Sequence, residues 1–115
     1  MAYTLKIGEQ APDFNLLGTD NVFHDLSSYS KYKLLIISFT CNHCPYVIGS
    51  DETTRKTVEK YNRESMKLIC INSNSKNTYE ADSFENMQIR MKENKFPWDY
   101  LHDESQEIAS NYGAL

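Results

Sequence analysis

Two apolar segments stand out along the chain because neither shows the alternation of apolar and polar residues that a half-exposed strand would have. Residues 33–40 read KLLIISFT and residues 67–73 read KLICINS. Continuous apolar runs of this length are typical of parallel strands that are covered on both faces. The pattern therefore predicts two buried strands in an α/β sheet.

The N-terminal part of the chain predicts a β-hairpin. One strand is expected over Asp13 to Leu17 and a second over Val22 to Leu26, with the turn sequence Gly-Thr-Asp-Asn at residues 18–21 between them. Short apolar segments joined by turn-forming residues are characteristic of hairpins.

Helical segments are expected between the buried strands and after them. The first follows residue 44 and extends to about Glu64, with a bend or restart at residues 49–52. The second has Asp82 as its N-cap and Glu85 three residues later, and it ends before Pro97. Its apolar positions at helical spacing are Phe84, Met87 and Met91.

The C-terminal part predicts a short strand, Trp98 to Leu101, and a last helix. Asp103 and Gln106 repeat the capping signature, and Gly113 is a suitable left-handed stop. The complete order is hairpin, β, α, β, α, β, α, which predicts one α/β domain over residues 1–115 with helices covering a parallel sheet.

The composition fits one soluble domain and excludes several classes of function. The 115 residues are 40% hydrophobic and 24% charged, with a net charge of -4. This charge gives no basic surface for nucleic acid or an anionic membrane, and no segment approaches the roughly eighteen apolar residues of a membrane span. Three cysteines, an odd count, and no visible export signal lead us to expect a cytoplasmic thiol protein.

The sequence Cys41-Asn42-His43-Cys44 carries the candidate chemistry because it lies where a buried strand ends and a helix begins. Unpaired backbone N–H groups and the helix dipole favour a thiolate at that position, which makes Cys41 the expected nucleophile. Cys44 follows about one helical turn later, within reach to close a disulfide and release a mixed-disulfide intermediate. The sequence thus favours a redox-active pair.

The neighbouring residues are expected to tune this pair. His43 adds a titratable cation that stabilises the reduced thiolate, which makes the disulfide more oxidising. Pro45 suits the first helical turn and stiffens the loop. Thr40 and Asn42 complete the active-site loop.

Two other interpretations of the cysteine pair stay open at this point. A metal site needs further ligands, for which Cys70, His24 and His102 are the candidates, but no second CxxC or HxxxH motif accompanies the first. Alternatively, the two thiols are inert. No cofactor or metal is predicted.

The remaining chemistry-bearing residues have simpler interpretations. Cys70 lies inside a predicted buried strand and is expected to behave as a small hydrophobic residue. Asp51, Glu52 and Glu104 are interpreted as solvated or capping charges rather than as an acid–base pair.

Several motifs together resemble the thioredoxin-like superfamily, and within it the bacterial redoxins of the alkyl-hydroperoxide-reductase and thiol-specific-antioxidant type. The segments that carry the resemblance span nearly the whole chain and are Ala11-Pro12-Asp13-Phe14, FTCNHCPYV at 39–47, Ile71-Asn72-Ser73-Asn74, DSFENM at 82–87 and Tyr112-Gly113-Ala114. The resemblance implies a three-layer thioredoxin-like sandwich. It also implies a thiol–disulfide oxidoreductase, with Cys41 attacking and Cys44 resolving disulfides of proteins or small molecules.

Two departures from the family pattern shape the remaining expectations. Peroxiredoxins place a threonine three residues before the peroxidatic cysteine, whereas Ser38 stands there in this chain, so direct thiol-dependent peroxidase activity is the weaker alternative. The chain also ends at Leu115, where the family's cis-proline loop, C-terminal hairpin and last helix would follow, so we expect a truncated domain.

The expected truncation has a structural consequence. It would leave residues 34–39 as an apolar, unpaired sheet edge, through which copies of the chain could form a homo-oligomer. A further alternative to an enzyme is therefore a non-catalytic thioredoxin-like module for binding or assembly.

Overall fold

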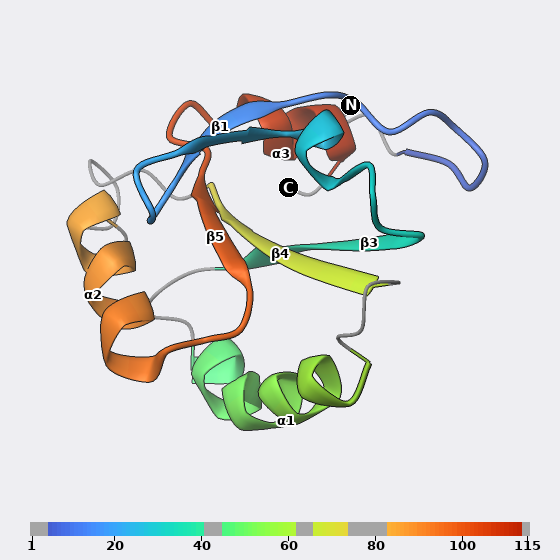
Figure 1. Cartoon of the computed structure of the whole chain (residues 1–115). Helices are drawn as coiled ribbons and strands as arrows, with labels where there is room; N and C mark the ends of the chain where they lie inside the picture. The colour runs from blue at the N-terminus through green and yellow to red at the C-terminus, as the bar shows by residue number, and fades with distance from the viewer. Residues whose placement is uncertain (1–4, 41–44, 62–65, 74–82, 114–115) are drawn as a thin grey trace.

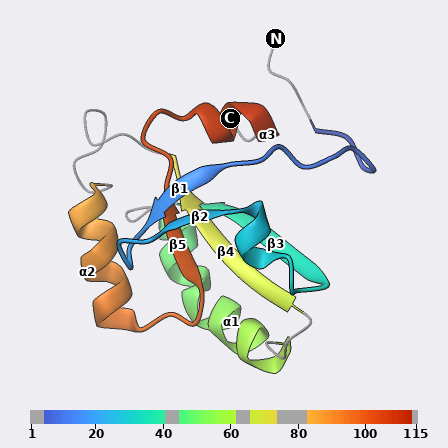
Figure 2. The same ribbon diagram turned by 45° about the horizontal axis from the view of Figure 1, so that its top comes forward.

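The computed structural model describes residues 5–40, 45–61, 66–73 and 83–113, and it has three layers. A five-stranded sheet forms the middle layer, with α3 on one face and with α1 and α2 on the other (Figures 1 and 2). The three-layer α/β architecture expected from the sequence is confirmed.

The elements follow one another along the chain in the expected order. They are β1 (Asn15–Gly18), β2 (Phe23–Asp25), the 3-10 helix η1 (Leu26–Tyr29), β3 (Leu34–Thr40), α1 (Pro45–Tyr61), β4 (Met66–Asn72), α2 (Phe84–Asn94), β5 (Asp99–His102) and α3 (Glu107–Tyr112). The strand order across the sheet is β2-β1-β5-β4-β3. Strands β3, β4 and β5 are parallel, whereas β1 is antiparallel to β2 and to β5.

The predicted hairpin is confirmed. Leu16 pairs with His24 across β1 and β2, and the turn closes with hydrogen bonds from Gly18 N to Val22 O and from Asn21 N to Gly18 O, both 2.9 Å. Asn21 adopts a left-handed conformation with a φ of 64°, as tight turns of this kind require.

Strand β4 is a buried strand, as its sequence predicted, with β5 on one side and β3 on the other. Its side chains alternate between two cores, because successive residues of a strand point to opposite faces of the sheet. Leu68 and Cys70 pack with Val58 of α1 and Met87 of α2. On the other face, Ile69 and Ile71 are fully buried in a cluster with residues of β1, η1, β5 and α3, namely Leu16, Tyr29, Leu101 and Ile108.

Strand β3 differs from β4 because it lies at the edge of the sheet. Within the part of the chain that the structure describes, it pairs only with β4, from Leu34 opposite Met66 to Thr40 opposite Asn72. Among the described strands, β3 is thus the outermost on this side of the sheet. The pattern-based prediction of cover on both faces is wrong for the start of this strand, since Leu34 and Ile36 are 54% and 41% exposed.

Helices α1 and α2 agree only in part with the sequence predictions. Helix α1 is continuous through residues 49–52, where a bend was expected. The N-cap of α2 is Ser83, whose hydroxyl accepts a hydrogen bond from Asn86 N at 3.2 Å; the predicted N-cap Asp82 lies outside the described residues.

Helix α3 has an unusual start. Gln106 is its N-cap residue but makes no side-chain cap bond. The cap is supplied by Asp103, which is 1% exposed and accepts hydrogen bonds from Ile108 N and Ala109 N at 3.3 and 2.9 Å. Gly113 ends the helix in the left-handed conformation, as expected.

Candidate functional site

The candidate redox pair is framed by two elements that the structure describes. Cys41, Asn42, His43 and Cys44 lie outside the described residues. Thr40 is the last residue of β3, and Pro45 is the first residue of the 17-residue helix α1. The four residues therefore connect the carboxyl end of a parallel strand to the amino end of a long helix, as the sequence predicted.

Three polar residues lie side by side at the carboxyl ends of three neighbouring strands. Thr40 is opposite Asn72, and Asn72 is opposite His102, so the row crosses β3, β4 and β5 at their carboxyl ends. Asn72 is fully buried and its amide donates a hydrogen bond to Tyr100 Oη at 3.2 Å. The His102 ring stacks on Phe84 of α2 with a centroid distance of 5.7 Å. In parallel α/β sheets this edge is the usual location of functional sites.

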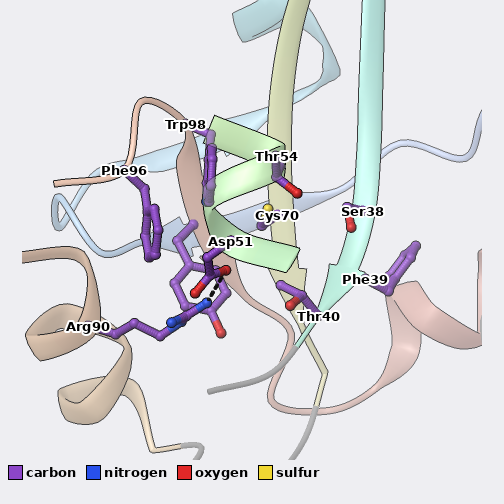
Figure 3. Close-up of a pocket in the computed structure, with 10 residues that line it drawn as sticks. Ser38, Phe39, Thr40, Asp51, Thr54, Cys70, Arg90, Phe96 and Trp98 are labelled. Atoms are coloured by element: carbon purple, nitrogen blue, oxygen red, sulfur yellow. Dashed lines mark hydrogen bonds and ion pairs between the residues drawn. The ribbon is translucent and has the colours of Figure 1, made fainter. Parts of the chain in front are cut away.

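A small cavity lies between the sheet and the two helices of the α1/α2 face. Its volume is about 80 Å³, and Figure 3 shows the side chains around it. Its lining residues are Ser38, Phe39, Thr40, Asp51, Thr54, Cys70, Arg90, Phe96, Trp98 and Tyr100. A space of this size suits several water molecules rather than a substrate.

The strongest charged contact of the site joins α1 to α2 across this cavity. Arg90 Nη2 donates to Asp51 Oδ1 at 2.7 Å, and the two side chains point toward each other in Figure 3. These side chains are only 14% and 18% exposed. The Arg90 guanidinium also lies over the Phe96 ring, 4.8 Å from its centroid.

The interpretation of Asp51 as a solvated or capping charge is therefore wrong. Its neighbour Glu52 fits that interpretation better, because the Glu52 side chain is 69% exposed and has only a 3.7 Å contact with Arg55. The sequence contained no local signal for the Asp51 contact, since its partner Arg90 lies 39 positions further along the chain.

Cys70 lines the same cavity, and the prediction that it lies buried in a strand is confirmed. It is 6% exposed, and burial raises the pKa of its thiol to about 12. The positive charge of Arg90 acts in the opposite direction and the negative charge of Asp51 adds to the increase in this pKa. A thiol that stays protonated at neutral pH is a poor nucleophile.

The hydroxyl of Thr40 is the polar group of the cavity closest in sequence to Cys41. Its Oγ1 atom is buried and has no hydrogen-bond partner among the described residues. Buried polar atoms of this kind are commonly satisfied by ordered water, and the cavity beside Thr40 has the space for it.

Among the described residues, the other candidate ligands His24, His102 and Cys70 do not come together as a metal site. His24 Nε2 lies 2.9 Å from Asp20 Oδ2 on the hairpin. Across the described ranges, no group of three or more His, Cys, Asp or Glu side chains could hold a metal ion. The helices described are also too short or too polar to cross a membrane.

The chain matches one known protein family. The sequence profile of the Redoxin family matches residues 6–115. No curated protein matches the chain.

Two solved structures resemble the chain over almost its whole length. A hypothetical protein of Sinorhizobium meliloti is 26% identical with a TM-score of 0.90, covering 97% of this chain and 61% of that one. A conserved protein of Geobacillus kaustophilus, itself uncharacterised, is 34% identical with a TM-score of 0.88, covering 96% and 59%. The chain thus spans about three-fifths of the length of each.

A more distant structure identifies the fold. The thioredoxin domain of a thiol-disulfide oxidoreductase from Bacteroides vulgatus is 13% identical with a TM-score of 0.75, covering 95% of this chain and 74% of that one. The fold of the chain is thioredoxin-like.

Proposed function

The chain belongs to the Redoxin family, and we propose that within this family it is a thiol–disulfide oxidoreductase that acts through Cys41 and Cys44. Family membership supports a general thioredoxin-like redox role. The proposal adds the cysteine pair, the order in which its members react, and protein or small-molecule disulfides and thiols as substrates.

One observation carries the proposal: the CNHC sequence connects the carboxyl end of β3 to the amino end of α1. The first N–H groups of an α-helix have no partner within the helix, and the helix dipole places positive potential there. Both effects lower the pKa of a thiol at that end, which increases the population of the nucleophilic thiolate.

The proposed reaction is a two-step thiol–disulfide exchange. The Cys41 thiolate attacks one sulfur of a substrate disulfide, forming a mixed disulfide and releasing the other substrate sulfur as a thiolate. The Cys44 thiolate then attacks Cys41 Sγ, which closes the Cys41–Cys44 disulfide and releases the second substrate thiol. Two electrons pass from the cysteine pair to the substrate, and the reverse sequence oxidises a dithiol.

The residues around the pair would tune its reactivity. His43 would stabilise the thiolate when protonated, and Pro45 begins the helix whose dipole acts on Cys41. Thr40 is the last residue of β3 and directly precedes the nucleophile in the sequence. Asn42 completes the loop.

Disulfide reduction by single-cysteine variants tests the proposal. With a disulfide-linked model peptide as substrate and glutathione as reductant, Cys41→Ser is expected to abolish catalysis. Cys44→Ser is expected to trap a mixed disulfide at Cys41 that mass spectrometry detects. Cys70→Ser is the matched control and is expected to retain activity, because this buried thiol takes no part in exchange.

The contrary result would favour a different function. Disulfide reduction at the uncatalysed background rate, both by wild-type protein and by Cys41→Ser, would support the alternative of a non-catalytic binding or assembly module. A metal retained in stoichiometric amount until denaturation would instead support a metal site.

Self-association through β3 is a second part of the proposal. The two edges of the sheet differ, because β2 has only three residues and includes His24 and Asp25, whereas β3 has seven residues without a charge. Short, charged edges resist pairing with another chain, while long apolar edges favour it. A second copy of the chain is the proposed partner, and a monodisperse monomer in solution scattering would contradict this.

A further inference from the structure

The cavity between the sheet and the helices α1 and α2 is lined by a polar atom that needs a partner. Thr40 Oγ1 is buried and has no hydrogen-bond partner among the described residues. A buried hydroxyl that leaves water without gaining a new hydrogen bond destabilises the folded protein, so such atoms are usually paired with the protein or with ordered water. A small molecule bound in the cavity can supply the bond that the described side chains do not.

The same cavity borders the ion pair that joins the two helices. Asp51 lines it from α1 and Arg90 lines it from α2 (Figure 3). Arg90 Nη2 donates to Asp51 Oδ1 at 2.7 Å, and the second carboxylate oxygen can also accept hydrogen bonds. Both side chains are mostly buried. Burial of an ion pair is favourable only when its remaining donors and acceptors are also satisfied, so further hydrogen bonds are expected here.

Further hydroxyl groups line the space around the ion pair. Ser38 belongs to β3, Thr54 to α1 and Tyr100 to β5. The hydroxyl of Tyr100 accepts a hydrogen bond from the amide of Asn72 at 3.2 Å, and a phenolic hydroxyl can also donate one. A buried water molecule typically makes about three hydrogen bonds to the protein. The polar groups of this cavity are numerous enough to provide them.

The charge and the size of the cavity favour a small neutral molecule. Asp51 and Arg90 carry opposite charges side by side, so the pair favours neither a cation nor an anion over a neutral molecule. The described ranges contain no group of three or more side chains that could hold a metal ion. A volume of about 80 Å³ holds more than one water molecule. Because cavities that stay dry have apolar linings, the polar lining indicates water.

A groove beside the cavity gives the side from which water can exchange. It has a volume of about 300 Å³ and lies between α1 and the strands β3 and β4. Ser38, Thr54 and Cys70 line both the cavity and the groove, so the two spaces are neighbours. Ile36, which also lines the groove, is 41% exposed, so the groove reaches the surface. The charged groups that would retain water line the inner cavity.

We propose that the cavity is an internal hydration site, in which ordered water molecules join the Thr40 hydroxyl to the Asp51–Arg90 ion pair. These waters link the carboxyl end of β3 to α1 and α2 through hydrogen bonds that Thr40 Oγ1 does not make with any described side chain. The inference is independent of the proposed function, because it involves no thiol chemistry.

High-resolution crystal structures of the chain and of three variants test this inference. Thr40→Val removes the unpartnered hydroxyl and keeps the shape of the side chain, while Cys70→Met places a longer side chain at the cavity wall. The matched control is Thr57→Val. Its hydroxyl donates to Thr53 O at 2.9 Å within α1, and the residue lines the groove but not the cavity. Oxygen-17 magnetic relaxation dispersion counts the long-lived internal waters of each protein in solution.

The variants are expected to differ in the number of bound waters. Wild-type protein should show water within hydrogen-bond distance of Thr40 Oγ1, connected directly or through a second water to Asp51 or Arg90. Thr40→Val should lose at least one long-lived water, and Cys70→Met should lose all those of the cavity. Thr57→Val should keep the wild-type number, because its hydroxyl is already bonded within the helix.

Several results would contradict the inference. It is wrong if no water lies at Thr40 Oγ1 in the wild-type structure, or if another molecule or an ion occupies the cavity. An unchanged number of long-lived waters in Thr40→Val would also contradict it, since the waters would then lie elsewhere. Should Cys70→Met not fold, Thr40→Val against Thr57→Val decides the question. None of these measurements depends on the reactivity of Cys41, which tests the proposed function.

Discussion

The two faces of β4 are packed by side chains of different chemistry, although they belong to the same seven residues. The face toward α3 is largely apolar, with Ile69 and Ile71 fully buried among aliphatic and aromatic neighbours. The face toward α1 and α2 holds the Cys70 thiol, the Asp51–Arg90 ion pair and a small cavity. The α3 face is therefore mainly apolar, apart from the 3.7 Å contact of Lys67 with Asp99, while the α1/α2 face keeps a thiol and a closer ion pair in a poorly solvated environment.

The largest effect that this comparison predicts is on stability. Ile71→Ala removes a fully buried aliphatic side chain and should lower the free energy of unfolding by about 3 kcal/mol. Cys70→Ala, at the adjacent position on the other face, removes a single sulfur beside an existing cavity and should cost about 1 kcal/mol. Urea denaturation of the two variants measures the difference, and equal losses would contradict the contrast between the faces.

A smaller effect is expected at alkaline pH on the polar face. The pKa of the Cys70 thiol is raised from 9.0 to about 12 in the folded protein, so its stabilising contribution is complete below pH 9. That contribution is lost as pH rises from 9 toward 12, because the unfolded chain releases the proton first.

A comparison of two proteins isolates this effect. Between pH 9 and 11, wild type should lose stability more steeply than Cys70→Ala. Tyr29, whose pKa burial also raises, is present in both and cancels. Parallel curves for the two proteins would show that the Cys70 thiol titrates normally.

The comparison between faces also shows how much of the molecule its sequence could predict. Local patterns identified β4, the hairpin and the left-handed stop at Gly113, because each depends on residues close together in the chain. The N-cap predicted for α2, Asp82, is one residue before the observed N-cap, Ser83. Sequence alone does not separate the two, since either side chain can accept the same kind of hydrogen bond.

The features of the candidate site that sequence reasoning missed all depend on tertiary contacts. In the sequence, Asp51 and Arg90 look like charged residues on exposed faces of two separate helices. Only the packing of α1 against α2 brings them together. The alignment of Thr40, Asn72 and His102 likewise requires the register of three strands. The apolar run at β3 resembled a central strand because hydrophobicity alone does not distinguish a covered strand from one at an edge.

The rate of alkylation at each cysteine tests the central claim most directly. Native protein is treated with iodoacetamide at mildly acidic pH, and mass spectrometry follows Cys41, Cys44 and Cys70 separately. We expect Cys41 to be labelled well before Cys70, whose thiol is buried and stays protonated. Equal labelling of all three cysteines would contradict an activated nucleophile at the amino end of α1.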